Sequence, residues 1–273
     1  MLRSLYSGIS GMRGFQTKLD VIGNNIANVN TIGFKASRVM FQDMLSQTIA
    51  GVSAPSDMRG GVNPKQIGLG VTIGSIDTIH TPGSAMTTNV VTDLRIEGDG
   101  FFAVSPDADV ETAFLTRAGN FMLDSERNLV TSTGMFVLDS DGAPIQLDED
   151  INAFTIAQDG EIIVIDADGN AEGTDIRIGI VVVTNPGGLE KIGSNLYRVT
   201  PNADLEDVMD LIGVANDPET GSGAIIAGQL EMSNVDLTTE FTEMIVAQRG
   251  FQSNSRIITT SDEILQEVVN LKR

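Results

Sequence analysis

Cysteine and tryptophan are absent from this chain of 273 residues, which has two tyrosines and one histidine. Without cysteine it can form neither a disulfide framework nor a thiolate metal site, and bonding does not reveal its redox compartment. Because aromatic residues are few and glycines number 29, the core has to be built from aliphatic residues, Met and Phe between many turns. The single histidine, His80, lies in a stretch rich in Thr, Gly and Pro, and we predict that it faces solvent without a catalytic role.

Long apolar runs and basic stripes are also missing. The first residues, MLRSLYSGISGMRGFQTKL, contain no unbroken apolar stretch, and nowhere do about 18 apolar residues follow one another. We therefore expect neither a Sec signal peptide nor membrane insertion. The net charge is −20, and residues 81–230 carry 26 acidic and six basic side chains. Such a surface repels phosphates, so nucleic acid is not an expected partner.

Patterns typical of enzymes and ligand sites are equally scarce. Residues 139–150 and 166–175 resemble calcium loops superficially, but their glycine comes at the fourth position and not the sixth, so we interpret both as hairpin turns. The stretches GLGVTIG and GSGAIIAG lack the spacing of a dinucleotide-binding loop. The sequence therefore predicts no enzyme activity, no metal site and no cofactor.

Apolar residues repeat every seven positions at both ends of the chain. Near the N-terminus two columns share this spacing: Leu5, Met12, Leu19 and Ile26, and Gly8, Phe15, Ile22 and Val29. Near the C-terminus one column holds Leu237, Met244, Phe251, Ile258 and Leu265, beside a second with Phe241, Gln248, Ser255, Asp262 and Val269. The pattern predicts two long helices with coiled-coil seams, the second capped by Ser233 or Asn234. Packing of the helices onto the chain's own body is the alternative.

Four asparagines interrupt the first seam: Asn24, Asn25, Asn28 and Asn30. An amide both donates and accepts hydrogen bonds, so these side chains could fix the register against neighbouring subunits. Alternatively they only end the helix and open a turn, in which Gly33 supplies a positive φ. We favour the second explanation for Asn30 and leave both open for Asn24 and Asn25.

The middle of the chain changes character twice. Residues 31–92 lose the seven-residue period and are rich in Gly, Ser, Thr and Pro, which indicates a linker with extended arms. Residues 93–228 contain short apolar runs separated by turn signals at Asp99-Gly100, Asp141-Gly142, Asp159-Gly160 and Asp168-Gly169. This part predicts a β-rich body.

Several motifs together resemble the flagellar hook and basal-body rod family. They are NNIANVNTIGFK (24–35), TRAGNF (116–121), GLEKIGSNLY (188–197) and the segment GQLEMSNVDLTTEFTEMIVAQRGFQSNSRIITTSDEILQEVVNL (228–271). The resemblance extends from Met1 to Arg273. It implies a structural subunit of the flagellar hook or basal body outside the cell, which leaves through the flagellar type III export apparatus. The implied partners are further copies of itself in a helical homopolymer and other axial proteins of the rod, hook–filament junction and hook cap.

Combined, these observations predict a mixed fold. Long N- and C-terminal α-helices would form a paired coiled-coil-like stalk, joined by extended linker arms to a central all-β domain. Residues 1–30 and 233–273 would be the helical polymerisation domain, residues 31–92 the linker, and residues 93–228 the acidic outer domain. The resemblance implies that the helices line an inner tube around the export channel.

The expected subunit interface follows the seams and the asparagines. It comprises Leu5, Met12, Phe15, Leu19, Ile22, Asn24, Asn25, Ile26, Asn28, Val29, Leu237, Phe241, Met244, Gln248, Phe251, Ile258 and Leu265. Within the family, the resemblance favours the short hook subunit of Bacillus-like bacteria, with a distal rod subunit as the alternative. A secreted acidic binding or adhesin module, or a hydrolase using turn carboxylates, would not need seamed helices at both ends.

Overall fold

The computed structural model describes residues 2–55, 60–107, 112–147, 153–165, 171–205, 208–218 and 220–271. The chain divides into two compact units. Unit 1 contains residues 1–27, 37–78 and 236–273, and unit 2 contains residues 28–36 and 79–235. The chain therefore passes between the units several times.

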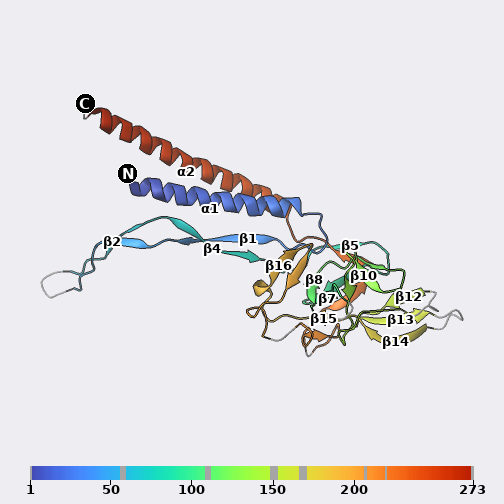
Figure 1. Cartoon of the computed structure of the whole chain (residues 1–273). Coiled ribbons are helices and arrows are strands. Elements are labelled where there is room, and N and C mark those ends of the chain that lie inside the picture. The colour runs from blue at the N-terminus through green and yellow to red at the C-terminus, as the bar shows by residue number, and fades with distance from the viewer. Residues whose placement is uncertain are drawn as a thin grey trace. The chain divides into compact units, whose positions relative to one another are not determined.

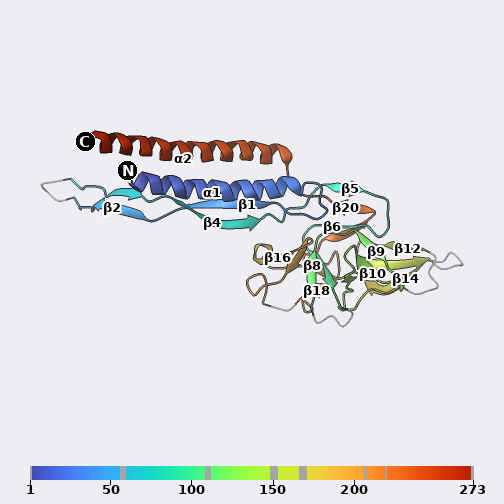
Figure 2. The same cartoon turned by 45° about the horizontal axis from the view of Figure 1, so that its top comes forward.

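Two helices and a pair of β-hairpin segments make up unit 1. Helix α1 spans Leu2–Ala27 and helix α2 spans Leu237–Leu271, and they pack side by side (Figures 1 and 2). Among the described residues, neither helix is long and apolar enough to cross a bilayer.

Helix α1 ends where its asparagines cluster. Ala27 is its last residue, and the Thr31 N–H donates to the Asn28 carbonyl in the turn that follows. Gly33 has φ +68°, and a Cβ there would lie 2.7 Å from the Ala118 nitrogen, so the position needs glycine. The helix therefore ends before Asn28 and a turn with a positive φ at Gly33 follows, as we favoured for Asn30, whereas Asn24 and Asn25 lie within α1.

Asp236 caps the start of α2, whereas we predicted Ser233 or Asn234. Its carboxylate accepts hydrogen bonds from the Thr238 N–H at 3.0 Å and the Thr239 hydroxyl at 2.7 Å. The Thr239 hydroxyl, followed by the Thr238 N–H, lowers the pKa of Asp236 because both stabilise its charged form. Asp236 thus satisfies N–H groups that have no partner within the helix.

Residues between the two helices contribute an extended arm to unit 1. Strand β1 (Ser37–Asp43) pairs antiparallel with β4 (Val71–Thr78), and β2 (Ser46–Ala50) pairs antiparallel with β3 (Lys65–Gly68). Strands β1 and β4 pack along α1 (Figure 1). We call residues 37–78 the arm.

The predicted paired coiled-coil stalk is wrong, although the mixed α and β character holds. The described residues contain only these two α-helices beside a large β-rich body. Helix α2 buries Ala247 and Ser261, which belong to neither predicted column, while Gln248 and Phe251 are exposed. The predicted column accounts for part of the contact, since Ile258 lies against Gly8 of α1, but Ala247, Gly250 and Asn254 lie outside it and also belong to the contact or the buried face.

Unit 2 is almost entirely β-structure with one short 3₁₀ helix, Pro186–Gly188. Its strands are β5 (Ala85–Thr87), β6 (Leu94–Glu97), β7 (Phe101–Ser105), β8 (Phe114–Thr116), β9 (Phe121–Leu123), β10 (Leu129–Thr131), β11 (Phe136–Val137), β12 (Ala153–Ile156), β13 (Glu161–Ile165), β14 (Ala171–Arg177), β15 (Ile180–Val181), β16 (Glu190–Gly193), β17 (Leu196–Arg198), β18 (Ile212–Gly213), β19 (Ala224–Ala227) and β20 (Gln229–Glu231).

Strand β7 lies at the centre of the largest sheet. That sheet has the order β16-β17-β8-β7-β11-β10-β9, and β15 pairs with both β7 and β18. All five residues of β7, FFAVS, are buried, so its continuous apolar run fits a strand covered on both faces. Strands β12, β13 and β14 form a separate antiparallel sheet, and the pairs β19-β6 and β20-β5 complete the unit.

Three of the four predicted turn signals are found in the structure. Gly100, Gly142 and Gly160 have φ values of +133°, +80° and +82°. Glycine adopts such values without the steric cost that other residues have. The fourth signal, Asp168-Gly169, lies outside the described residues. The Asp139 carboxylate of one supposed calcium loop accepts bonds from the backbone N–H groups of Ser140 and Arg177, as expected of a turn.

Candidate functional site

Helices α1 and α2 touch through glycines. A Cβ on Gly250 of α2 would lie 2.6 Å from Cζ of Phe15, and one on Gly11 of α1 would lie 2.7 Å from Nδ2 of Asn254. Neither distance leaves room for a methyl group without a shift. Small residues therefore make room on each helix for side chains of the other helix, such as Phe15 and Asn254.

Polar contacts fix the register at the other end of the helix pair. Lys18 of α1 forms an ion pair with Glu243 of α2. Asn25, 1% exposed, donates to Glu240 Oε1 at 3.0 Å and to the Ser37 carbonyl at 2.9 Å, and accepts from the Ser37 N–H at 3.0 Å. Burial raises the pKa of Glu240, and its bond from Asn25 opposes that rise. These bonds explain a buried asparagine at position 25 without a neighbouring subunit.

The expected interface residues fall into three groups by burial. Ile22 and Asn25 are buried in unit 1. Others are partly buried: Leu5, Met12, Phe15, Leu19, Ile26, Asn28, Val29, Met244, Ile258 and Leu265. The remainder are exposed: Asn24, Leu237, Phe241, Gln248 and Phe251. Asn28 and Val29 belong to unit 2 and the rest to unit 1.

Helix α2 also exposes apolar residues that lie outside both predicted columns. They are Ile245, Val246, Ile257, Ile264, Val268 and Leu271. A helix with apolar residues on several sides is typical of one that is surrounded on several sides. Plotting all apolar positions on a helical wheel, without a seven-residue template, could have found this surface.

The far part of the arm is exposed as well. Leu45 is 83% exposed and Val52 73%, and Ile49, Val62 and Ile67 are also exposed. A two-stranded hairpin is marginally stable by itself in water. An arm with uncovered apolar side chains and a pair of edge strands is therefore a surface suited to a protein partner.

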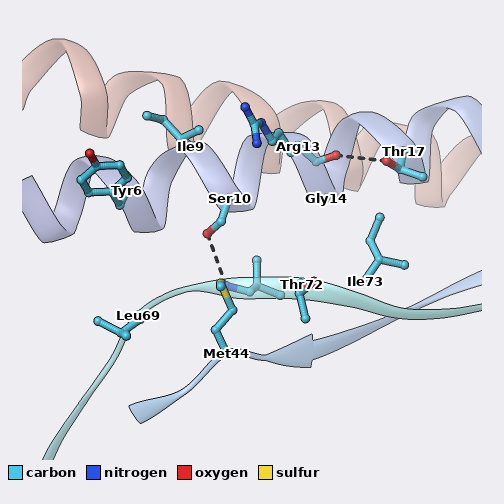
Figure 3. A pocket seen from close by; sticks show the side chains of 11 residues that line it. Tyr6, Ile9, Ser10, Arg13, Gly14, Thr17, Met44, Leu69, Thr72 and Ile73 are labelled. Carbon is cyan, nitrogen blue, oxygen red and sulfur yellow. Dashed lines mark hydrogen bonds between the residues drawn. The ribbon is translucent and has the colours of Figure 1, made fainter. Parts of the chain in front are cut away.

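A groove of about 420 Å³ runs between α1 and the arm (Figure 3). Helix α1 contributes Tyr6, Ile9, Ser10, Arg13, Gly14 and Thr17, and the arm contributes Met44, Leu69, Val71, Thr72 and Ile73. A hydrogen bond connects the arm to α1 in this groove, because the Val71 N–H donates to Oγ of Ser10 at 3.3 Å. The Ser10 hydroxyl in turn donates to the Ser7 carbonyl at 2.9 Å. The groove combines apolar walls with one cation, Arg13.

Unit 2 contains a buried cluster of charges that the sequence did not reveal. Glu231 of β20 accepts from Lys35 Nζ at 2.6 Å on one oxygen and faces Arg117 Nη1 at 3.3 Å with the other. The side chains of Lys35 and Glu231 are each 1% exposed, and that of Arg117 is 3%. Burial lowers the pKa of Lys35, and the adjacent Glu231 carboxylate opposes that shift. We call Lys35, Arg117 and Glu231 the clasp.

The clasp holds segments that are distant in sequence. Lys35 also donates to the Thr81 carbonyl at 2.7 Å, and the Gly83 N–H donates to Glu231 Oε1 at 2.9 Å. The Gly33 N–H donates to the Glu231 carbonyl at 2.8 Å. One carboxylate residue therefore fixes both residues 28–36 and residues 79–83 to β20.

All four motifs that carried the family resemblance meet here. Lys35 ends the first motif, Arg117 lies in TRAGNF, and Glu231 lies in the segment that begins at Gly228. The remaining motif supplies Lys191, which donates to the Lys35 carbonyl at 3.1 Å, and Asn195, which donates to the Ile32 carbonyl at 2.7 Å. Because the four motifs are far apart in the sequence, the sequence alone did not predict that they lie close together.

His80 lies beside the clasp, and our prediction that it faces solvent is wrong. Its ring packs against Phe101 and Tyr197, with centroids 5.7 Å from each. Burial lowers its pKa to about 4, and the nearby cations Lys35, Lys191 and Arg117 contribute. The ring is therefore neutral at pH 7.

Three parts of the chain match models of flagellar proteins. Residues 226–271 match the family described as flagellar basal body rod FlgEFG protein C-terminal, residues 95–164 match the flagellar hook protein FlgE/F/G D1 domain, and residues 5–35 match the flagella basal body rod protein. The chain belongs to this flagellar rod and hook family. It is an axial structural protein of the bacterial flagellum.

Individual relatives match along the entire chain. The flagellar basal-body rod protein FlgG of Bacillus subtilis is 58% identical over 274 residues, which cover 100% of both chains. The FlgG of Borreliella burgdorferi is 39% identical over 277 residues, and the flagellar hook protein FlgE of the same organism is 30% identical over 450 residues, each again covering 100% of both chains.

Proposed function

We propose that this chain is a distal rod subunit that assembles with copies of itself and with other axial proteins. The main support is the full-length identity of 58% to a rod protein. Alignment to a hook protein needs 450 positions against 277 for the rod protein of the same organism, so the hook protein carries a large insertion that this chain lacks. We therefore assign the chain as a rod subunit and no longer as a hook subunit, which was our first expectation from the sequence.

The uncovered surfaces of unit 1 support self-assembly. The outer face of α2 and the far part of the arm expose Ile245, Val246, Leu45 and Ile49. Burying such side chains releases about 25 cal/mol for each Å² of apolar surface removed from water. Copies of the same chain would cover these faces, and the groove between α1 and the arm would take part. Export through the flagellar type III apparatus remains part of this proposal.

Complementation distinguishes the rod from the hook. The gene would be expressed in a bacterium lacking its own rod protein and, separately, in one lacking its hook protein. We expect filaments and swimming to be restored only in the first strain. Rescue of the second strain alone would overturn the rod assignment while leaving the axial family in place. Electron microscopy of polymers from purified protein adds a second readout, since a rod subunit should give straight polymers.

A further inference from the structure

A small cavity is lined by His80 and by Arg117 of the clasp. It has a volume of about 180 Å³, and His80, Asp99, Arg117 and Pro186 are among the residues that line it. Within the described part of the chain, Nδ1 of His80 and Nε of Arg117 are the buried side-chain polar atoms without a hydrogen-bond partner. An unsatisfied buried polar atom is costly, which marks this cavity as a place where small changes in charge matter.

The charged and titratable groups near His80 come from five parts of unit 2. They are Lys35 from residues 28–36, Asp99 from the turn before β7, Arg117 after β8, Lys191 on β16 and Tyr197 on β17. A hydrogen bond with the Pro186 backbone also acts on the ring and raises the pKa of His80. Glu231 is already engaged by Lys35 and Arg117, which leaves Asp99 as the carboxylate that could meet an imidazolium. A proton on His80 would therefore add a fourth cation next to three existing ones.

Hydrogen bonds in this part of unit 2 connect the residues at which the chain passes to unit 1. Asn234 Oδ1 accepts from the Ala36 N–H at 2.8 Å, and its Nδ2 donates to the Ile79 carbonyl at 2.9 Å. The Ile79 N–H in turn donates to the Ala36 carbonyl. The clasp bonds involve residues 33, 35, 81 and 83, which lie close in sequence to Ala36 and Ile79.

We propose that His80 is a pH-dependent latch, whose protonation opens the clasp and releases residues 28–36 from the body of unit 2. The imidazolium is repelled by Lys35, Lys191 and Arg117 and leaves its aromatic pocket. That movement breaks the packing against Phe101 and Tyr197 beside the clasp. The latch is closed while the ring is neutral.

The direction of the pH effect follows from linkage. The pKa of His80 is lowered from 6.5 to about 4 in the folded chain, so the open form binds the proton more readily. The stability contributed by the neutral ring is fully present above pH 6.5 and is lost as the pH falls toward about 4. Between about pH 7.5 and about pH 5.5 the opening equilibrium should rise about tenfold.

The first test uses the fact that the chain has one histidine. A proton NMR titration of the full chain follows the single imidazole signal directly and needs no variant. Because protonation is coupled to opening, we expect a midpoint above about 4, the pKa of the closed ring, and below 6.5. A midpoint at about 4 would show that the ring is protonated without opening and would also overturn the latch. A midpoint near 6.5 would show a solvated ring and would overturn the latch.

Hydrogen exchange provides the second test. The Gly33 amide, bonded to Glu231, reports on the clasp, and the Leu138 amide, bonded to Ala103 in the core, is the internal control. After correction for intrinsic exchange, opening at Gly33 should increase about tenfold between about pH 7.5 and about pH 5.5, while Leu138 stays unchanged.

His80→Phe is the decisive variant, because phenylalanine fits between aromatic rings and cannot be protonated. It should remove the pH dependence at Gly33 while protection at about pH 7.5 is kept. If the same pH dependence persisted in this variant, or if Gly33 opening in the wild-type chain did not change, the latch would be refuted. Should His80→Phe not fold, His80→Gln serves the same comparison.

Discussion

Units 1 and 2 bury their side chains in opposite ways. Unit 2 encloses two apolar clusters around β7 and satisfies a buried carboxylate with two cations. Unit 1 buries few apolar residues, among them Ile22, Val39 and Ala247, and exposes many large ones. Unit 2 thus has an apolar core of its own, whereas unit 1 leaves many large apolar side chains exposed, which we propose that other subunits cover. Substitutions in unit 2 should therefore lower the stability of the monomer, whereas substitutions in unit 1 should impair assembly.

The largest effect is expected from Glu231→Gln in unit 2. Removing this charge leaves Lys35 and Arg117 buried without a counterion, which should cost about 3–5 kcal/mol in the free energy of unfolding. Urea denaturation of the monomer measures the loss. Glu190→Gln is the matched control, since Glu190 pairs with Arg198 at the surface, where the cost should stay below about 1 kcal/mol. Equal losses in both variants would contradict the difference between buried and exposed pairs.

Ile245→Asp in unit 1 should leave the monomer intact and prevent assembly. Ile245 is 53% exposed in the single chain, so the variant should unfold like the wild type. Burying the new charge against another copy should raise the critical concentration for polymerisation about 100-fold or more. Sedimentation of polymers measures this. Met122→Asp in unit 2, where Met122 is 56% exposed, is the control and should polymerise normally. Normal assembly of Ile245→Asp would exclude this face of α2 from the interface.

A smaller effect is expected at the start of α2. Asp236→Ala removes the cap that accepts from Thr238 and Thr239 and should destabilise the helix by about 1 kcal/mol. Hydrogen exchange over the first two turns of α2 detects this fraying. Asp236→Asn, which keeps a capping oxygen, should restore most of the protection. Equal fraying in the alanine and asparagine variants would show that the cap is unimportant.

Local features were predictable from the sequence and long-range ones were not. The turns at Gly100, Gly142 and Gly160 depend on the glycine and its neighbours, and they were predicted correctly. The helix contact was predicted only in part, because Gly11 meets Asn254 and Gly250 meets Phe15, and hydrophobic periodicity points to Phe15 alone among these. The termini were correctly expected to be helical.

The clasp could not be predicted from sequence patterns because its residues are far apart in the chain. Lys35 and Glu231 are 196 residues apart, and Arg117 is 114 residues from Glu231. No periodicity links such positions, and a charge on an ordinary loop usually faces water. His80 was misjudged in the same way, because its burial comes from Phe101 and Tyr197 and not from its own neighbourhood.

The bond between Asn234 and the Ile79 carbonyl brings the two ends of residues 79–235 together. A segment whose ends meet can be removed or exchanged as a cassette, because the flanking chain needs only a short bridge to close the gap. Asn234 binds backbone atoms of Ala36 and Ile79, so the identity of those two residues matters little to the tie. A foreign domain with similarly adjacent termini would have to replace residues 28–36 as well, because these residues also belong to unit 2.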